Sequence, residues 1–265
     1  DGAAGLAWTP AGRLITVRKL GAVQQLWSEN SDGSDGHAIA VDHLPPFTHV
    51  RTIAPNGQIL LGSQGEPASI WRLNADGTGL TELVQPPPGA DAYSPSLVHG
   101  GAAVTFMMVG ADGDQSLEIV PLAGGAPQKA WNGFIYAGSD AASQDGTRVV
   151  VMARGTARGS HQVGYVRLDG GQPQFVALAL DSKTMLPGYD WTPDGKAIVY
   201  RRSHGSADDL WALPLDGSKT YPLTHFNDLK ITSYRFSRDG RLAISRGSQN
   251  RDAVLASGLP AKGRP

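Results

Sequence analysis

The sequence repeats one short pattern six times, and this repeat constrains the fold more than any other feature. Each copy has an apolar or aromatic start, a turn centred on Gly, and a run of apolar and β-branched residues, as in "WTPDGKAIVY" (191–200). The anchor glycines are Gly12, Gly57, Gly101, Gly146, Gly195 and Gly240, with successive spacings of 45, 44, 45, 49 and 45 residues. A nearly constant period of this length indicates a repeat architecture built from one supersecondary unit.

Each copy also has a second half with its own Gly turn, as in "SIWRLNADG" (69–77) and "DLWALPLDG" (209–217). In such turns Pro presets φ, Asp or Asn accepts hydrogen bonds from its own backbone, and Gly takes the left-handed position. The flanking residues alternate apolar and polar, which is typical of strands. Each unit therefore holds two hairpins, whose strands we call a, b, c and d. We predict an all-β fold, a six-bladed β-propeller of four-stranded antiparallel blades. A β-sandwich would not explain six copies of one two-turn unit.

The pattern "WTPDGKAIVY…DLWALPLDGSKTYPLT" resembles the TolB-type, WD-repeat-like propeller repeat of bacteria, and the resemblance covers nearly the whole chain. The ending "FSRDGRLAISRGSQNRDAVL" (236–255) is also similar to propellers appended to bacterial serine/threonine kinases and winged-helix regulators. The α/β N-terminal domain of the TolB family has no counterpart in this sequence, so contacts made by that domain do not carry over. The resemblance favours a bacterial, extracytoplasmic location but does not determine it.

We expect residues 1–258 to form a single propeller domain and residues 259–265 to form a flexible tail. The sixth copy supplies strand a (231–237), strand b (241–247) and strand c (252–258), and leaves little sequence for strand d. The last blade is therefore expected to be incomplete. In the alternative, residues upstream of Asp1 complete the ring, because propellers often close by sharing a blade between the two ends of the chain.

Composition excludes several classes of function. Lys and Arg number 23 and Asp and Glu number 24, so no net field attracts nucleic acid. The absence of Cys excludes disulfides, thiolate catalysis and cysteine-bound zinc. No apolar run approaches the ~20 residues that cross a bilayer, and the first ten residues do not resemble a signal peptide.

Motifs for catalysis and metal binding are also missing. The sequence has no G-x-S-x-G elbow, no P-loop and no H-x-x-x-H pair. Ser160 and His161 are adjacent, so on a strand they point to opposite faces. His43 with His49, and the acidic "SDGSDG" segment (31–36), are interpreted as loop and turn residues, and Asp208 and Asp209 as exposed residues at the start of a strand. We therefore predict a non-enzymatic protein with no catalytic residues, no metal and no cofactor.

One position of the repeat suggests a binding role. The residues six places after the anchors are Arg18, Ser63, Met107, Met152, Arg201 and Arg246. The first, fifth and sixth copies become neighbours when the ring closes, so Arg18, Arg201 and Arg246 would form a cationic arc that recognises an acidic peptide or a carboxylate. In the alternative, each Arg packs along a strand end and is solvated.

The connections between strands suggest which face binds a partner. The a–b and c–d turns are short and uniform and form one face, the turn face. The b–c and d–a connections vary between copies and form the opposite face, the loop face, where binding usually resides. The aromatic residues predicted to contact a partner there are Phe47, Tyr93, Trp131, Phe134, Tyr189 and Phe226, although each could instead pack between blades.

The favoured function is a non-catalytic module that binds a protein or peptide, or senses a ligand, through the loop face. One alternative is a regulatory sensor domain of a larger bacterial kinase or transcription regulator. The other is a propeller hydrolase or lyase, which would need polar residues pointing into the central channel. The starts of strand a are mostly apolar (Leu6, Val50, Tyr234), which argues against that enzyme. The partner's identity and the oligomeric state do not follow from the sequence.

Overall fold

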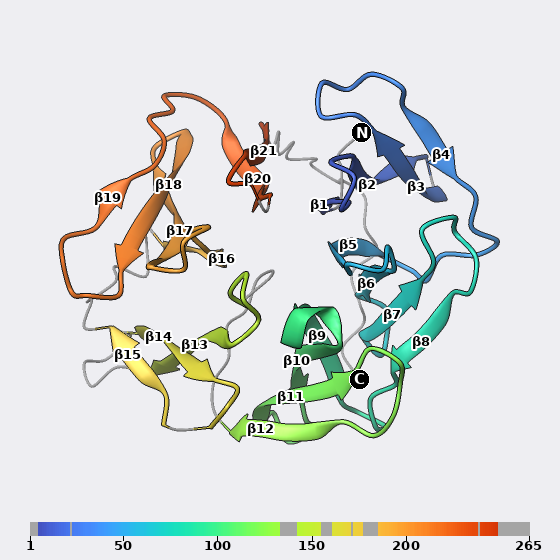
Figure 1. Ribbon diagram of the computed structural model, residues 1–265, viewed down its shortest axis with the longest axis horizontal. Coiled ribbons are helices and arrows are strands. Elements are labelled where there is room, and N and C mark those ends of the chain that lie inside the picture. The colour runs from blue at the N-terminus through green and yellow to red at the C-terminus, as the bar shows by residue number, and fades with distance from the viewer. Residues whose placement is uncertain are drawn as a thin grey trace, which may run out of the picture.

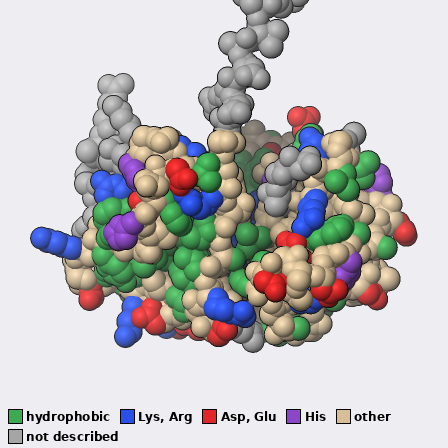
Figure 2. Space-filling model, turned by 90° about the horizontal axis from the view of Figure 1, so that it is seen from above, with side chains coloured by type: hydrophobic (Ala, Val, Ile, Leu, Met, Phe, Trp, Pro, Cys, Tyr) green, Lys and Arg blue, Asp and Glu red, His purple; other side chains and the backbone are tan. Residues whose placement is uncertain are grey.

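The chain forms antiparallel sheets arranged like blades around a central axis (Figure 1). The computed structural model describes residues 5–21, 23–132, 142–154, 161–170, 172–176, 185–237 and 239–248. In each sheet the strands follow chain order from the axis to the rim. Turned by 90°, the molecule is a wide, shallow disc on which positive and negative side chains are interspersed (Figure 2).

The first three sheets contain four strands each. The first comprises β1 (Leu6–Trp8), β2 (Leu14–Leu20), β3 (Val23–Glu29) and β4 (His37–Ile39). The second comprises β5 (His49–Ile53), β6 (Ile59–Ser63), β7 (Ser69–Leu73) and β8 (Thr81–Val84). The third comprises β9 (Asp91–Val98), β10 (Ala103–Val109), β11 (Gln115–Pro121) and β12 (Gln128–Asn132), with the 3-10 turn η1 (His99–Gly101) between β9 and β10.

The remaining three sheets differ in the number of strands described. The fourth comprises β13 (Arg148–Arg154), β14 (His161–Arg167) and β15 (Gln174–Val176). The fifth comprises β16 (Met185–Trp191), β17 (Ala197–His204), β18 (Ala207–Pro214) and β19 (Tyr221–Pro222). The sixth comprises β20 (Lys230–Phe236) and β21 (Leu242–Gly247).

The prediction of an all-β propeller with antiparallel blades is confirmed. Four sheets have the expected four strands. In the fourth sheet, which has three strands, Ala142 also pairs with Val149 of β13 through an isolated antiparallel bridge, at the position expected for strand a. Only two strands of the sixth sheet lie in the described part of the chain, so a complete sixth blade is not confirmed. The predicted strand 252–258 and the predicted tail 259–265 lie outside the described residues.

The anchor glycines adopt the backbone conformation for which the repeat selects them. All six have positive φ, from 64° at Gly195 to 91° at Gly101. In five copies the Gly amide donates to the carbonyl three residues earlier, as from Gly195 to Thr192 at 2.8 Å. The third copy turns through η1 instead. At Gly101 a side chain is also excluded by packing, because a Cβ would lie 2.4 Å from Cδ of Pro55 on the neighbouring blade.

The hydrophobic cores lie between neighbouring sheets. Four clusters follow the ring from the first sheet to the sixth, and Leu61, Ile70, Trp191 and Ile198 are among their most buried side chains. Burying one such side chain stabilises the fold by about 1.5–3 kcal/mol. The first and sixth sheets also meet, since β20 lies beside β1 and the Arg241 guanidinium lies 4.9 Å from the centre of the Trp8 ring. No helix in the described part of the chain has the length and apolar character needed to span a membrane.

Candidate functional site

The central channel opens on the turn face as a cavity of about 460 Å³. Its lining includes residues from all six copies of the repeat, and the fourth copy contributes Ala142 and its turn residues. The residue five places before the anchor Gly recurs in this lining: Ala7, Thr52, Ser96, Asp190 and Arg235. The repeat therefore delivers one side chain from nearly every blade to the same place, and two of these side chains are charged.

Asp190 and Arg235 form an ion pair inside the channel. The Oδ2 atom of Asp190 lies 3.6 Å from Nη1 of Arg235, and the two side chains are 10% and 13% exposed. Asp190 Oδ1 accepts a hydrogen bond of 2.8 Å from the Trp191 amide, and Arg235 Nη2 donates to the Arg51 carbonyl at 3.3 Å. Arg235 thus reaches from the sixth blade to the fifth and the second, and these contacts compensate for burying its charge.

A second, smaller cavity of about 120 Å³ occupies the loop-face end of the channel. Three arginines line it: Arg51, Arg201 and Arg235. His49 also lines it, and both burial and the nearby Arg51 charge lower the pKa of His49 below its usual value, partly offset by a hydrogen bond with Gln64. Basic side chains from three blades therefore line this cavity.

Sequence reasoning missed the charged residues of the channel. It considered Leu6, Val50 and Tyr234, which are buried hydrophobic side chains. These three residues contribute to the lining of the small cavity, but the charged residues Arg51 and Arg235 are the next residues in their strands, and successive side chains of a strand alternate in direction. Counting five residues back from each anchor Gly would have found Asp190 and Arg235.

Arg51 does not stand at a repeated distance from its anchor Gly that would mark it as a channel residue. The pairing of β5 with β6 shifts between Val50 and Thr52, so Arg51 is the extra residue of a β-bulge. Bulges re-aim side chains and are common next to binding sites. The inner strands β9, β16 and β20 have similar irregularities in their pairing with the next strand.

The three arginines predicted as a cationic arc have different surroundings. Arg18 pairs with Glu29 at 2.6 Å, and its guanidinium lies 4.3 Å from the centre of the Trp27 ring. Arg246 pairs with Asp228 at 2.6 Å and lies 3.6 Å from the centre of the Phe226 ring. Arg201 instead lines the small cavity and donates to the Ile231 carbonyl. Binding of an acidic peptide or a carboxylate by these three arginines stays a prediction. Of the three, Arg201 lines a cavity of the central channel.

The predicted aromatic contacts also separate by burial. Phe47 is 65% exposed and has a φ of 52°. Tyr189 is 2% exposed and belongs to a core cluster, so it packs between blades. Trp131 packs partly against the same cluster, and Phe226 lies in the cluster between the fifth and sixth sheets.

Tyr93 is half-buried, and burial together with the Asp91 carboxylate raises the pKa of its hydroxyl. Phe134 lies outside the described residues.

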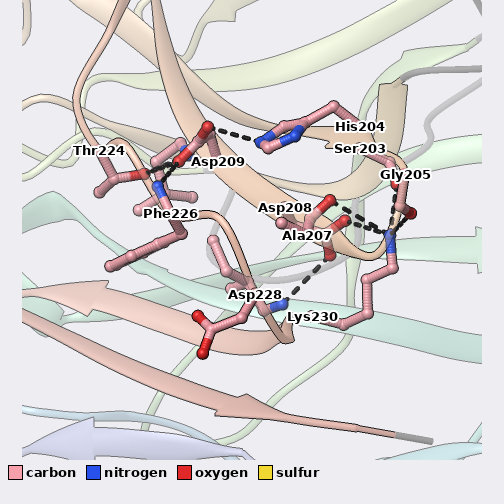
Figure 3. A network of polar contacts seen from close by, with 12 residues as sticks. Ser203, His204, Gly205, Ala207, Asp208, Asp209, Thr224, Phe226, Asp228 and Lys230 are labelled. Carbon is pink, nitrogen blue, oxygen red and sulfur yellow. Dashed lines mark hydrogen bonds and ion pairs between the residues drawn. The ribbon is translucent and has the colours of Figure 1, made fainter.

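The loop between β19 and β20 is held to the fifth blade by two buried carboxylates (Figure 3). Asp209 accepts hydrogen bonds from Thr224 Oγ1 at 2.8 Å and from the Phe226 amide at 2.7 Å, and it lies 2.7 Å from His204 Nε2. Burial alone would raise the pKa of Asp209, but these contacts together lower it. The expectation that Asp208 and Asp209 are exposed was wrong, because they are 1% and 8% exposed.

Asp208 makes the second attachment, at the start of β20 where this loop ends. It accepts from Lys230 Nζ and from the Ile231 amide, both at 3.1 Å. The same ammonium group donates to Ser203 Oγ and to the carbonyls of Gly205 and Ala207 (Figure 3). These carboxylates therefore order a connection of the loop face.

Exposed hydrophobic side chains are concentrated on the loop face. The large ones in the described part of the chain are Leu20, Val23, Phe47, Phe175, Tyr221 and Leu229. Leu20 and Val23 flank a b–c turn, while Phe47 and Leu229 lie in d–a connections. Gln24 joins two of these segments, because its amide accepts from the Thr48 amide at 2.8 Å and donates to the Thr48 carbonyl at 3.1 Å. We call Leu20, Val23 and Phe47 the loop-face patch.

Metal ligation finds no support in the arrangement of acidic and histidine side chains. Among the described residues, no three or more His, Asp or Glu side chains gather around a common position. In the "SDGSDG" segment Asp32 accepts from the amide and hydroxyl of Ser34, at 2.9 and 2.7 Å, as expected of a turn.

Comparison with known proteins supports the fold. The putative TolB from Agrobacterium tumefaciens aligns with a TM-score of 0.68 and 15% identity, over 94% of this chain and 91% of that chain. The chain shares the β-propeller fold of TolB-type proteins.

Other similar structures include a second TolB and an enzyme. TolB from Acinetobacter baumannii aligns with a TM-score of 0.60 and 16% identity, over 82% of this chain and 53% of that chain. The gluconolactonase XC5397 from Xanthomonas campestris aligns with a TM-score of 0.65 and 19% identity, over 92% and 83%. No family model and no curated protein matches the sequence. At these identities the likeness establishes the fold alone.

Proposed function

We propose that this chain is a non-catalytic binding module that presents its loop face to a protein or peptide. The observation that carries the proposal is the loop-face patch: Leu20, Val23 and Phe47 are 54%, 66% and 65% exposed. Gathered apolar side chains on a surface mark interaction sites more often than scattered ones do. Of the six large exposed hydrophobic side chains in the described residues, Leu20, Val23, Phe47 and Leu229 lie at this face, and Phe175 and Tyr221 lie in outer strands.

The geometry around Phe47 supports this role. Its φ of 52° is unfavourable for a residue with a side chain. The flanking backbone is held by Thr48 Oγ1, which donates to the Pro45 carbonyl at 2.6 Å, and by Ser63 Oγ, which donates to the Pro46 carbonyl at 2.9 Å. A residue whose backbone is already fixed loses less conformational entropy when a partner covers its side chain.

Capture experiments with matched variants test the proposal. The purified chain is immobilised, and proteins that bind it from an extract of the source cells are quantified. The double variant Val23→Ser, Phe47→Ser is expected to reduce capture by about tenfold or more, because buried anchors dominate such interfaces. The control Phe175→Ser, Tyr221→Ser removes exposed aromatics of the outer strands and should leave capture unchanged. Equal capture by both double variants would contradict the proposal.

A second candidate function is a hydrolase or lyase acting in the channel, and the Asp190–Arg235 pair favours it. Two similar structures are a gluconolactonase and an oligogalacturonate lyase in complex with manganese. Assays of lactones and oligogalacturonates with the wild-type chain and Asp190→Asn test it. Turnover that disappears in Asp190→Asn would replace the non-catalytic proposal.

The hypothesis of a regulatory sensor domain is compatible with the loop-face proposal and is tested by the genes or domains fused to this chain.

A further inference from the structure

We infer that the turn-face cavity of the central channel binds a neutral, polyhydroxylated small molecule of the size of a monosaccharide or an inositol. The cavity has a volume of about 460 Å³, which lies within the range of small-molecule sites. The inference goes beyond the proposed docking on the loop-face patch, because the cavity lies at the other end of the channel. It concerns binding alone and does not require catalysis.

Two polar groups in the lining of this cavity have no hydrogen-bond partner in the described part of the chain. Ser96 of β9 is 1% exposed, and its hydroxyl makes no hydrogen bond there. The indole Nε1 atom of Trp8 in β1 is buried and likewise unpaired, although the residue as a whole is only half-buried. Buried polar groups are almost always paired in folded proteins. An unpaired hydroxyl and an unpaired N–H beside one cavity therefore indicate a bound partner that the chain does not supply.

The charges of the lining indicate that the ligand is neutral. The described lining residues include two carboxylates and two guanidinium groups, and these form two ion pairs. Asp190 lies 3.6 Å from Arg235, and Asp239 lies 2.9 Å from Arg241. Because each charge has an opposite charge beside it, the lining offers an ionic ligand little net attraction.

The other side chains of the lining indicate a ligand with several hydroxyl groups. A hydroxyl both donates and accepts hydrogen bonds, so it can pair with the Ser96 hydroxyl and can accept from the Trp8 indole N–H. Apolar side chains such as Ile53, Leu97 and Phe236 also line the cavity and can contact the C–H groups of a carbon ring. Small-molecule sites typically combine such an apolar lining with a few convergent polar groups. The combination favours a carbon ring that carries hydroxyl groups.

Contacts between blades hold the turns that line the cavity. Gln144 in the turn of the fourth copy donates through its side-chain amide to the Ser237 carbonyl of the sixth copy at 3.3 Å, although the fifth blade lies between them around the ring (Figure 1). The Arg241 guanidinium of the sixth copy lies 4.9 Å from the centre of the Trp8 ring of the first. These contacts organise the lining without a ligand, which lowers the entropic cost of binding one.

NMR titration of the full chain provides the test. Glucose, galactose and myo-inositol are added separately, and the indole N–H signal of Trp8 is followed after its assignment with Trp8→Phe. We expect saturable shifts of this signal with at least one of the three. Trp27 provides an internal control, because its Nε1 atom is also buried and unpaired among the described residues but does not line the cavity. The indole signal of Trp27 should not shift.

Two further probes test which chemistry the cavity recognises. Glucuronate has the ring of glucose with a carboxylate, and tetrahydropyran has the ring without hydroxyl groups. Both should shift the Trp8 signal less, at equal concentration, than the neutral polyol that responds. An equal or stronger response to glucuronate would contradict selection of a neutral ligand, and an equal response to tetrahydropyran would contradict recognition of hydroxyl groups.

Ser96→Ala and Thr16→Val form a matched pair of variants. Each removes a buried hydroxyl that is unpaired among the described residues, but only Ser96 lines the cavity. Calorimetry with the polyol that responds should show binding weakened by about three- to tenfold in Ser96→Ala, as expected for the loss of one hydrogen bond. Thr16→Val should leave binding unchanged.

If Ser96→Ala impairs folding, Trp8→Phe serves as the second variant in calorimetry and should weaken binding by a similar factor. The absence of saturable shifts with all three polyols would overturn the inference. Equal affinities of the wild-type chain, Ser96→Ala and Trp8→Phe would also overturn it, since the polyol would then bind elsewhere. Binding of a polyol by a chain that turns over no lactone or oligogalacturonate would support the inference while the enzymatic candidate fails.

Discussion

The two ends of the central channel are built in different ways. The turn-face cavity of about 460 Å³ is ringed by turns that repeat from blade to blade, and its charged lining residues form two ion pairs, Asp190 with Arg235 and Asp239 with Arg241. The loop-face cavity of about 120 Å³ is lined by residues that include the bulge residue Arg51, together with Arg201 and Arg235 from two other blades. The repeated turns thus give the turn face a uniform structure. Features that do not repeat, such as the β-bulge at Arg51, determine which side chains line the loop-face end of the channel.

The largest expected effect concerns the loop face. Asp208→Ala removes a carboxylate that is 1% exposed and leaves the Ile231 amide without its acceptor and Lys230 without its counterion. Breaking such a pair is expected to lower the free energy of unfolding by about 3 kcal/mol. Urea denaturation measures the change. The control Asp216→Ala affects an exposed turn and should cost much less, so equal losses would mean that the loop attachment contributes little.

An intermediate effect is expected on the turn face. Gly101→Ala places a Cβ against Pro55 at a φ of 91°, whereas Gly100→Ala meets nothing within 4 Å at a φ of 65°. Both variants incur backbone strain of about 1–2 kcal/mol, but only the first also disturbs the contact between blades. Thermal denaturation should rank Gly101→Ala as clearly less stable than Gly100→Ala. Similar melting temperatures would show that the turn, and not the contact between blades, selects Gly101.

The smallest expected effect depends on pH. The Thr192 hydroxyl donates to Asp194 at 2.7 Å, and this bond and the Lys196 amide lower the pKa of Asp194. A lowered pKa in the folded state adds stability above the unfolded pKa of about 3.9, and this stability is lost as pH falls through the folded pKa.

Thr192→Val should therefore destabilise the protein more at pH 7 than at pH 3, as measured by the free energy of unfolding. Thr81→Val is the control, because that hydroxyl bonds the Gly79 carbonyl and no carboxylate. The penalty of the control should be the same at both pH values. A penalty of Thr192→Val that does not change with pH would show that the turn carboxylate contributes nothing through its ionisation.

Much of the propeller could be predicted from the sequence, and much of the candidate site could not. Turn residues such as Pro193, Asp194 and Gly195 are selected by local backbone geometry, so they identify strands and blades without any knowledge of distant contacts. Phe47 was predicted correctly to lie on the loop face, whereas the burial of Tyr189 depends on the neighbouring blade. The exposure of Asp208 and Asp209 was predicted wrongly for the same reason, since their partners Thr224 and Lys230 come from the next connection and from the start of β20.

The sequence by itself determined the repeat, the antiparallel blades and the separation into a turn face and a loop face, because these follow from interactions within about 45 residues. Only the tertiary structure decided which charged side chains meet. Arg51, Arg201 and Arg235 are separated by up to 184 positions in the chain and converge because the ring brings the second, fifth and sixth blades around one axis. Which side chains enter the channel depends on strand alternation and bulges, and convergence from several blades has no local signal in the sequence.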